Sequence, residues 1–182
     1  MVLVISNRAE SGGVRLAREH GIPVHVLNDI ADADEWLRVL AAAKAELVVL
    51  AGFLKRVPVP VVRAWSGRMI NIHPALLPRH GGPGMYGRRV HEAVLASGDT
   101  TSGATVHLVT EEYDEGETLC QGVVPVLPGD TPETLAARVL EIEHKLLPAA
   151  VLAAAESGLP LTQGSGSNGR RVPSPQSPAP RP

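Results

Sequence analysis

The sequence contains a single cysteine, Cys120, so no disulfide bond can form within the chain. Its N-terminus lacks the charged start, apolar stretch and small-residue cleavage site that mark a signal peptide. Apolar runs are short: one of the longest, Leu47–Leu54, contains a glycine and falls far below the roughly 20 residues that cross a bilayer. These absences predict a soluble protein of the reducing cytoplasm with no membrane partner.

Neither sign of charge is in excess, because 17 lysines and arginines oppose 19 acidic residues and the net charge is -2. A chain of this balance has no broad attraction for nucleic acid or an anionic membrane, so we expect no nucleic-acid partner. The histidines and the cysteine do not follow the spacing of a metal site, and we expect no metal. An anionic small-molecule substrate would have to be held by local contacts.

The 182 residues suffice for one domain with a substantial core. Apolar patterns predict strands over residues 2–5, 24–27, 47–51, 69–73, 105–109 and 120–126, and helices over 14–20, 32–44, 88–97 and 131–158. This alternation predicts an α/β fold with a mostly parallel sheet covered by helices on both faces. We assign residues 1–158 to the folded domain and residues 159–182, where proline, glycine and serine dominate, to a disordered tail.

Two helices carry clear signals at their N-termini. Asp32 is followed three residues later by Glu35, which predicts a capping box for the helix over 32–44. Thr131 and Pro132 are typical of an N-cap and a first helical position, and apolar residues at helical spacing follow them. The last helix is therefore predicted to be amphipathic and to continue past Pro148.

A polar pair stands at the end of the strand predicted over 69–73. Because side chains alternate along a strand, Asn71 and His73 point to the same side, and Pro74 stops the strand directly after them. An asparagine amide can donate to a developing oxyanion, and a histidine can donate a hydrogen bond or shuttle a proton near neutral pH. The pair suits attack on a carbonyl, although polar residues at strand ends also serve plain structural purposes.

The surroundings of this pair carry a longer pattern. The segment Ile70–Pro78 reads INIHPALLP and resembles the NIHP[SA]LLP signature of the folate-dependent formyltransferases. Further segments resemble that family in the same order, namely Ser6–Ala9 with Gly12 and Gly13, Leu50–Leu54, Gly103–His107, and Tyr113–Gly116 through to Gln121. Segments that look like the end region of the glycinamide ribonucleotide branch are Pro125–Val126, Asp130–Leu135 and Glu141–His144. The resemblance covers residues 2–148.

The resemblance implies the three-layer, Rossmann-like fold of these enzymes. It also implies transfer of the formyl group of 10-formyltetrahydrofolate to the amine of 5-phosphoribosylglycinamide, a step of de novo purine (IMP) biosynthesis. Asn71 would donate to the developing oxyanion, protonated His73 would stabilise it, and Asp114 would favour the charged imidazolium and organise water for proton transfer. Without the resemblance, Asp114 would be interpreted as an ordinary turn aspartate.

Residues that bind the two substrates are also implied by the resemblance. Those that would hold the folate are Leu54, Lys55, Arg56, Val57 and Asn71. Those that would contact the ribonucleotide are Glu143, through the ribose hydroxyls, together with Gly84 and Met85 of a glycine-rich loop. That loop replaces a two-histidine run of the family, and its glycines would equally suit a plain turn.

Several polar side chains also have simpler interpretations. Exposed basic residues after a strand, such as Lys55 and Arg56, are often merely solvated. We interpret His91 as a helix-surface residue, and His107 as a structural residue that faces the helices covering the sheet.

The family begins with a strand that enters a Gly-Ser-Gly-Ser-Asn loop, whose backbone N–H groups bind the substrate's phosphate. This chain starts at the segment that corresponds to the second strand, so we expect a sheet divided between the strands at 2–5 and 47–51. Gly164–Asn168 repeats the loop letters, which would fit a circular permutation. Leu159–Leu161 is too short and proline-broken for a central strand, however, and the surrounding composition favours a linker.

Other functions stay open at this point. A formyltetrahydrofolate hydrolase would use the same chemistry with water as the nucleophile, although its histidine is usually followed by a second histidine, where this chain has Pro74. A truncated, non-catalytic protein could retain only the folate pocket. A generic nucleotide-binding Rossmann domain is disfavoured, because no glycine-rich fingerprint follows a strand near the start. We expect a monomer or a homodimer.

Overall fold

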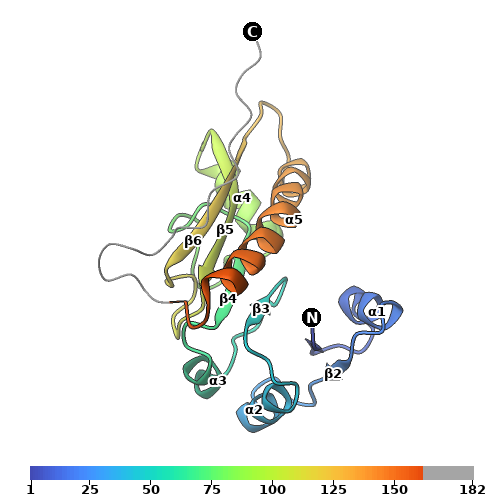
Figure 1. Ribbon diagram of the computed structural model, residues 1–182. Coiled ribbons are helices and arrows are strands. Elements are labelled where there is room, and N and C mark those ends of the chain that lie inside the picture. The colour runs from blue at the N-terminus through green and yellow to red at the C-terminus, as the bar shows by residue number, and fades with distance from the viewer. Residues whose placement is uncertain (162–182) are drawn as a thin grey trace, which may run out of the picture.

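The computed structural model describes residues 1–161, so the predictions for residues 162–182, including Gly164–Asn168, lie outside the described residues. Along the described part the elements follow in the order β1 (Val4–Ser6), α1 (Gly12–Glu19), β2 (Val24–Val26), α2 (Ala33–Ala42), β3 (Val48–Leu50), α3 (Val59–Ala64), β4 (Met69–His73), α4 (Arg88–Ala96), β5 (Thr101–Leu108), β6 (Thr118–Pro125) and α5 (Pro132–Ser157). Figure 1 shows β2, α1 and α2 together at one end, with α5 lying along the long strands β5 and β6.

The strands form two sheets, with the orders β1-β2 and β3-β4-β5-β6. The α/β class is confirmed, and the strands divide where the sequence predicted. The pairs β1-β2 and β3-β4 are parallel, whereas β4-β5 and β5-β6 are antiparallel. The parallel prediction thus fits the first half of the chain. The second half instead holds the two antiparallel pairs. For β5 and β6, the intervening residues 109–117 are too few for a parallel crossover, which needs about a dozen residues or more.

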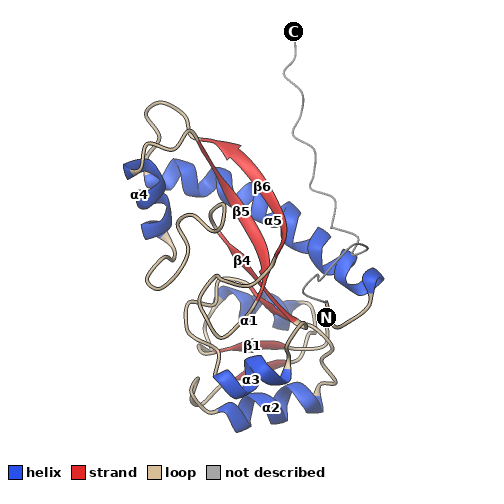
Figure 2. Cartoon of the chain, turned by 90° about the vertical axis from the view of Figure 1, so that its left-hand side faces the viewer, coloured by secondary structure: helices blue, strands red, loops and turns tan. Residues whose placement is uncertain are grey.

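Two apolar clusters form the core of the described residues. The larger lies between the four-stranded sheet and the helices α4 and α5, and its fully buried members include Ile70, Val106 and Leu135. The smaller surrounds Trp36 and Met69, between α2, α3 and β3. Figure 2 shows α2 and α3 side by side beneath the strands, and α5 crossing behind β5 and β6. The strand β4 contributes to both clusters and is therefore held from both faces.

The predicted N-terminal cap of α5 is confirmed, whereas the capping box predicted for α2 is wrong. The Thr131 side chain accepts a hydrogen bond from the backbone of Thr134, and the helix continues through Pro148 to Ser157 as predicted. Asp32 caps α2, but Glu35 does not bond back to the cap. The carboxylate of Glu35 instead accepts hydrogen bonds from His25, Asn28 and the Asp29 backbone, because the preceding loop brings these donors to it.

Most elements lie within two residues of their predicted bounds, and β5 and α3 show the larger differences. β5 begins at Thr101, four residues before the predicted start, because Ser102 and Gly103 pair with β6. The helix α3 was not predicted. It has only six residues, and Pro58 at its N-cap and Pro60 in its first turn made this segment look like a loop in the sequence.

Candidate active site

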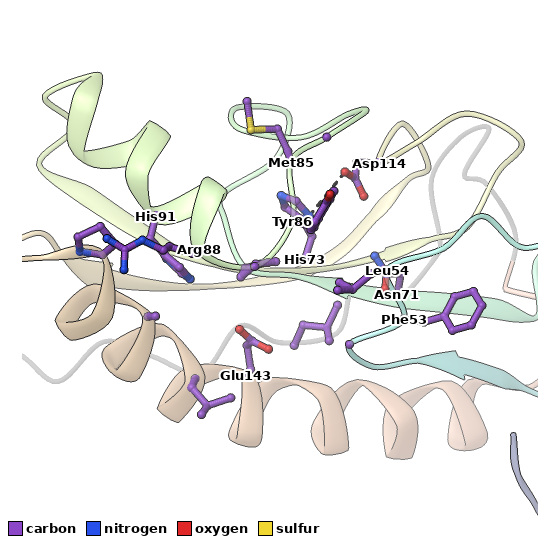
Figure 3. Close-up of a pocket in the computed structure, with 18 of the residues that line it drawn as sticks. Phe53, Leu54, Asn71, His73, Met85, Tyr86, Arg88, His91, Asp114 and Glu143 are labelled. Atoms are coloured by element: carbon purple, nitrogen blue, oxygen red, sulfur yellow. Dashed lines mark ion pairs between the residues drawn. The ribbon is translucent and has the colours of Figure 1, made fainter. Parts of the chain in front are cut away.

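A cavity of about 660 Å³ opens beside the end of β4. Its walls come from segments far apart in the sequence: the turn after β3, the end of β4, the glycine-rich loop before α4, the start of α4, and the first half of α5. In Figure 3, Asn71, His73 and Asp114 lie on the sheet side, and Glu143 points toward them from α5. The structure therefore places the predicted catalytic residues at one cavity.

The amide of Asn71 is anchored by a residue of the neighbouring strand. His107 lies directly opposite Asn71 in the antiparallel pairing of β4 and β5, and the distance from Asn71 Nδ2 to His107 Nε2 is 3.1 Å. His107 Nδ1 lies 2.9 Å from the backbone carbonyl oxygen of Leu108, so this nitrogen carries the proton in the neutral ring. His107 Nε2 is then an acceptor, and Asn71 donates to it while keeping a second N–H free.

His73 is buried, and each of its ring nitrogens faces an oxygen atom. Its Nε2 donates to the backbone carbonyl of His80 over 2.8 Å, and its Nδ1 lies 3.5 Å from Oδ2 of Asp114. Burial lowers the pKa of His73, while the negative charge of Asp114 acts in the opposite direction. The lowering dominates, so His73 is mainly neutral near pH 7. The stabilising role of its protonated form stays a prediction for the reaction itself.

Asp114 occupies a tight turn with a left-handed backbone, at φ 58°. Its Oδ2 accepts the backbone N–H of Gly82 over 2.9 Å, and its Oδ1 lies 3.5 Å from His107 Nε2. Burial raises the pKa of Asp114, but its polar contacts, among them the hydrogen bond from the Gly82 backbone, outweigh burial and hold it below its usual value. A charged carboxylate therefore faces both histidines.

The residues implied for folate binding are divided between two adjoining hollows. Leu54 lines the large cavity, whereas Lys55, Arg56 and Val57 line a smaller hollow of about 70 Å³, and Asn71 and Asp114 border both. Arg56 donates to the backbone carbonyl of Glu111 and stacks over the Tyr113 ring at 5.7 Å. The guanidinium of Arg56 is thus engaged within the protein, and Val57 is 4% exposed and belongs to the core.

The residues implied for ribonucleotide binding all line the large cavity. Gly84 and Met85 belong to its glycine-rich wall, and Glu143 faces it from the opposite helix. Burial raises the pKa of Glu143, and the nearby His144 offsets only part of that effect.

Two histidines correct the sequence interpretation. His107 does not face the covering helices; it contacts Asn71 and lies near Asp114 in the site. His91 is not a surface residue, because it is 5% exposed, lines the cavity, and leaves its Nδ1 without a partner among the described residues. Strand pairing and the orientation of α4 decide both positions, and neither is encoded by local sequence.

Within residues 1–161 no group of three or more histidine, cysteine, aspartate or glutamate side chains could hold a metal ion. Within the same range no helix is long and apolar enough to cross a membrane.

An amide, an imidazole and a carboxylate thus share one cavity at a strand end of an α/β fold, and these groups are suited to group transfer at a carbonyl. Comparisons with known proteins identify the class further. The formyl transferase family model matches residues 1–151. Because this match spans most of the chain, the protein belongs to the formyl transferase family.

Several relatives carry a more specific name. The phosphoribosylglycinamide formyltransferase of Arabidopsis thaliana, described as chloroplastic, is 46% identical over 177 residues, which cover 90% of this chain and 61% of the relative. The Escherichia coli (strain K12) phosphoribosylglycinamide formyltransferase is 35% identical, covering 93% of this chain and 81% of its own. The crystal structure of the Anaplasma phagocytophilum phosphoribosylglycinamide formyltransferase superposes with a TM-score of 0.79 at 38% identity, covering 86% of this chain and 76% of that one.

The coverage is uneven between these relatives. The chain spans 61% and 56% of the lengths of its plant relatives from Arabidopsis thaliana and Vigna unguiculata. These comparisons establish membership of the family.

Proposed function

We propose that this protein transfers the formyl group of 10-formyltetrahydrofolate to the amine of 5-phosphoribosylglycinamide in purine biosynthesis. The observation that carries the proposal is the convergence of Asn71, His73 and Asp114 on one cavity in a member of the formyl transferase family. Named phosphoribosylglycinamide formyltransferases that match most of this chain support the choice of substrate.

Asn71 is suited to stabilise the oxygen of the formyl group. One of its two amide N–H bonds points to His107, at 3.1 Å, and the other remains for the oxygen on which negative charge develops as the amine attacks. Because His107 fixes the amide before substrate arrives, little reorganisation is needed during the reaction.

His73 is suited to move a proton at its Nδ1. Its Nε2–H is committed to the His80 carbonyl, so Nδ1 is the nitrogen that gains or loses a proton within the site. Asp114 faces this nitrogen at 3.5 Å and stabilises the imidazolium that forms. The lowered pKa makes neutral His73 the resting state and a competent acceptor for the proton that leaves the attacking amine.

The cavity walls fit both substrates in chemical character. Phe53 and Leu54 offer apolar surface in the cavity that Asn71 also lines, which suits a flat pterin ring. Glu143, half-buried on α5, can accept hydrogen bonds from the hydroxyls of a ribose. Arg56 is occupied by Glu111 and Tyr113, so we assign it to shaping the folate pocket rather than to binding a folate carboxylate. No part of this proposal needs a metal, a nucleic acid or a membrane, and we place the protein in the cytoplasm.

Carbon-13 labelling of the formyl group tests the proposal and separates it from hydrolysis. The protein is incubated with labelled 10-formyltetrahydrofolate, with and without 5-phosphoribosylglycinamide, and the products are followed by NMR. We expect the label in a formamide only when the amine is present. Label appearing as formate at the same rate in both samples would instead identify a hydrolase, and binding of folate without any turnover would identify a non-catalytic folate-binding protein.

A further inference from the structure

The carbonyl that orients His73 belongs to a residue with an unusual backbone. His80 has φ 55°, in the left-handed region that only a few per cent of residues other than glycine adopt, histidine more often than most. Its backbone oxygen accepts the hydrogen bond from His73 Nε2 over 2.8 Å. A residue in this conformation needs support from its surroundings, so the interactions of the His80 side chain bear on the site.

The side chain of His80 is held by an acid from beyond α4. His80 Nε2 lies 2.7 Å from Oδ2 of Asp99, and the two side chains are only 14% and 16% exposed. Asp99 follows Gly98, directly after the end of α4, and its other oxygen pairs with Arg79 over 2.7 Å. The hydrogen bond from His80 is the main cause that lowers the pKa of Asp99, so the carboxylate is charged at neutral pH.

We infer that His80 and Asp99 form a positioning pair that holds the His80 carbonyl on Nε2 of His73 and so fixes Nδ1 as the nitrogen that exchanges a proton. This role rests on the proposed function. Neither residue is part of the described cavity walls, so both act through His73 and not on the substrate. The chain of contacts is continuous, from Asp99 to the His80 ring, through the His80 backbone, to His73.

The physical reason is the choice between two tautomers. A neutral imidazole carries its proton on one nitrogen, and the partner of that nitrogen decides which one it is. When the His80 carbonyl stays in place, the proton lies on Nε2, and Nδ1 keeps a lone pair facing Asp114 and the cavity. If the carbonyl moves away, the other tautomer gains, with its proton on Nδ1 directed at Asp114 and no lone pair available to accept the substrate's proton.

The test compares variants of the pair with a matched control. Asp99→Asn removes the charge that holds the His80 ring, and His80→Asn removes the ring while keeping a residue that tolerates a left-handed backbone. Arg79→Ala is the control, because it removes the other partner of Asp99, which is exposed, and leaves His80 bonded. Nitrogen-15 NMR of the His73 ring in the substrate-free protein reports which nitrogen carries the proton, and steady-state kinetics report kcat and KM.

We expect both pair variants to shift His73 from the Nε2–H tautomer to a mixture, and to lower kcat about tenfold while each KM stays within about twofold. Arg79→Ala should resemble the unaltered protein, and Asp99→Glu, which restores the carboxylate, should recover part of the Nε2–H tautomer. An unchanged His73 tautomer in both variants, when circular dichroism shows them folded, overturns the inference. If one variant does not fold, the other decides.

The two proposals fail in different ways. Absence of formyl transfer by the unaltered protein counts against the proposed function, and the NMR measurement on His73 still tests the pair. Formyl transfer by the unaltered protein with an unchanged His73 tautomer in the variants counts against the pair alone.

Discussion

Asn71 on β4 and His107 on β5 face each other across an antiparallel strand pair, with Asn71 Nδ2 and His107 Nε2 3.1 Å apart. This contact orients the amide that is proposed to stabilise the formyl oxygen. It depends on His107 being neutral, since a protonated Nε2 would no longer accept from the amide. His107 therefore connects the geometry of the sheet to the chemistry of the cavity.

Replacing His107 tests that connection. In His107→Phe the ring volume is similar, but Asn71 loses its acceptor and its amide can rotate away from the formyl oxygen. We expect kcat to fall by about tenfold to a hundredfold, with KM nearly unchanged. The upper figure corresponds to the loss of kcat that is typical when an enzyme loses one hydrogen-bond donor to the oxyanion. His20→Phe, at the exposed end of α1, is the control for a lost histidine. An equal kcat in both variants would show that His107 does not orient the Asn71 amide for the reaction.

Asp114→Asn tests the electrostatic role of the carboxylate. Burial lowers the pKa of His73 and the Asp114 charge opposes this, so removing the charge should lower the His73 pKa further. The NMR titration midpoint of His73 should move to lower pH, and kcat at neutral pH should fall on the order of a hundredfold. An unchanged titration and unchanged turnover would assign Asp114 to the turn alone.

Glu35 predicts a pH dependence of stability away from the cavity. The hydrogen bond from His25 is the main cause that lowers the pKa of this carboxylate in the folded protein. Its stabilising contribution is therefore complete above the pKa of an unfolded glutamate and is lost as the pH falls through the lower, folded value. The urea midpoint of the unaltered protein should exceed that of Glu35→Gln at pH 7, and the difference should shrink below about pH 4.

The exposed carboxylate of Glu19 supplies the comparison for Glu35. Glu19→Gln should show nearly the same urea midpoint as the unaltered protein across the pH range, because its contact with Arg15 is a surface pair of 4.0 Å. A pH-independent difference between Glu35→Gln and the unaltered protein would mean that the Glu35 contribution is not one of charge.

Gly116 tests the packing that supports the Asp114 turn. A Cβ atom at this position would lie 1.7 Å from the carbonyl oxygen of Leu108, the same oxygen that His107 Nδ1 contacts. We expect Gly116→Ala to cost about 1–3 kcal/mol of unfolding free energy, measured by urea denaturation, and to reduce kcat by displacing the turn. Gly13→Ala is the matched control, since nothing lies within 4 Å of its Cβ and it stands in a helix.

Local sequence was sufficient for the elements that depend on local signals. β4 has the predicted bounds because its apolar alternation is bounded by Pro74, and α5 begins at the predicted cap. The shared orientation of Asn71 and His73 followed from strand geometry alone. Asp114 was predicted from family resemblance, and its place beside His73 is a tertiary contact that no local pattern contains.

What could not be predicted depends on register and on the orientation of elements. The pairing of Asn71 with His107 requires the register between β4 and β5, which are separated by a loop and a helix. The burial of His91 requires knowing which face of α4 turns toward the cavity. The contact between His80 and His73 could not be predicted from the sequence, because it is made by the backbone carbonyl of His80, whose position depends on the left-handed backbone of that residue.

Formyl transfer by the His73→Ala variant tests the central claim most directly. The initial rate of transfer from 10-formyltetrahydrofolate to 5-phosphoribosylglycinamide is measured for the unaltered chain, for a version extended by any upstream coding sequence, and for His73→Ala in each, with His20→Ala as control. We expect the rate of transfer to be retained in His20→Ala and lowered at least about a hundredfold in His73→Ala. Transfer at the full rate in folded His73→Ala would contradict the claim.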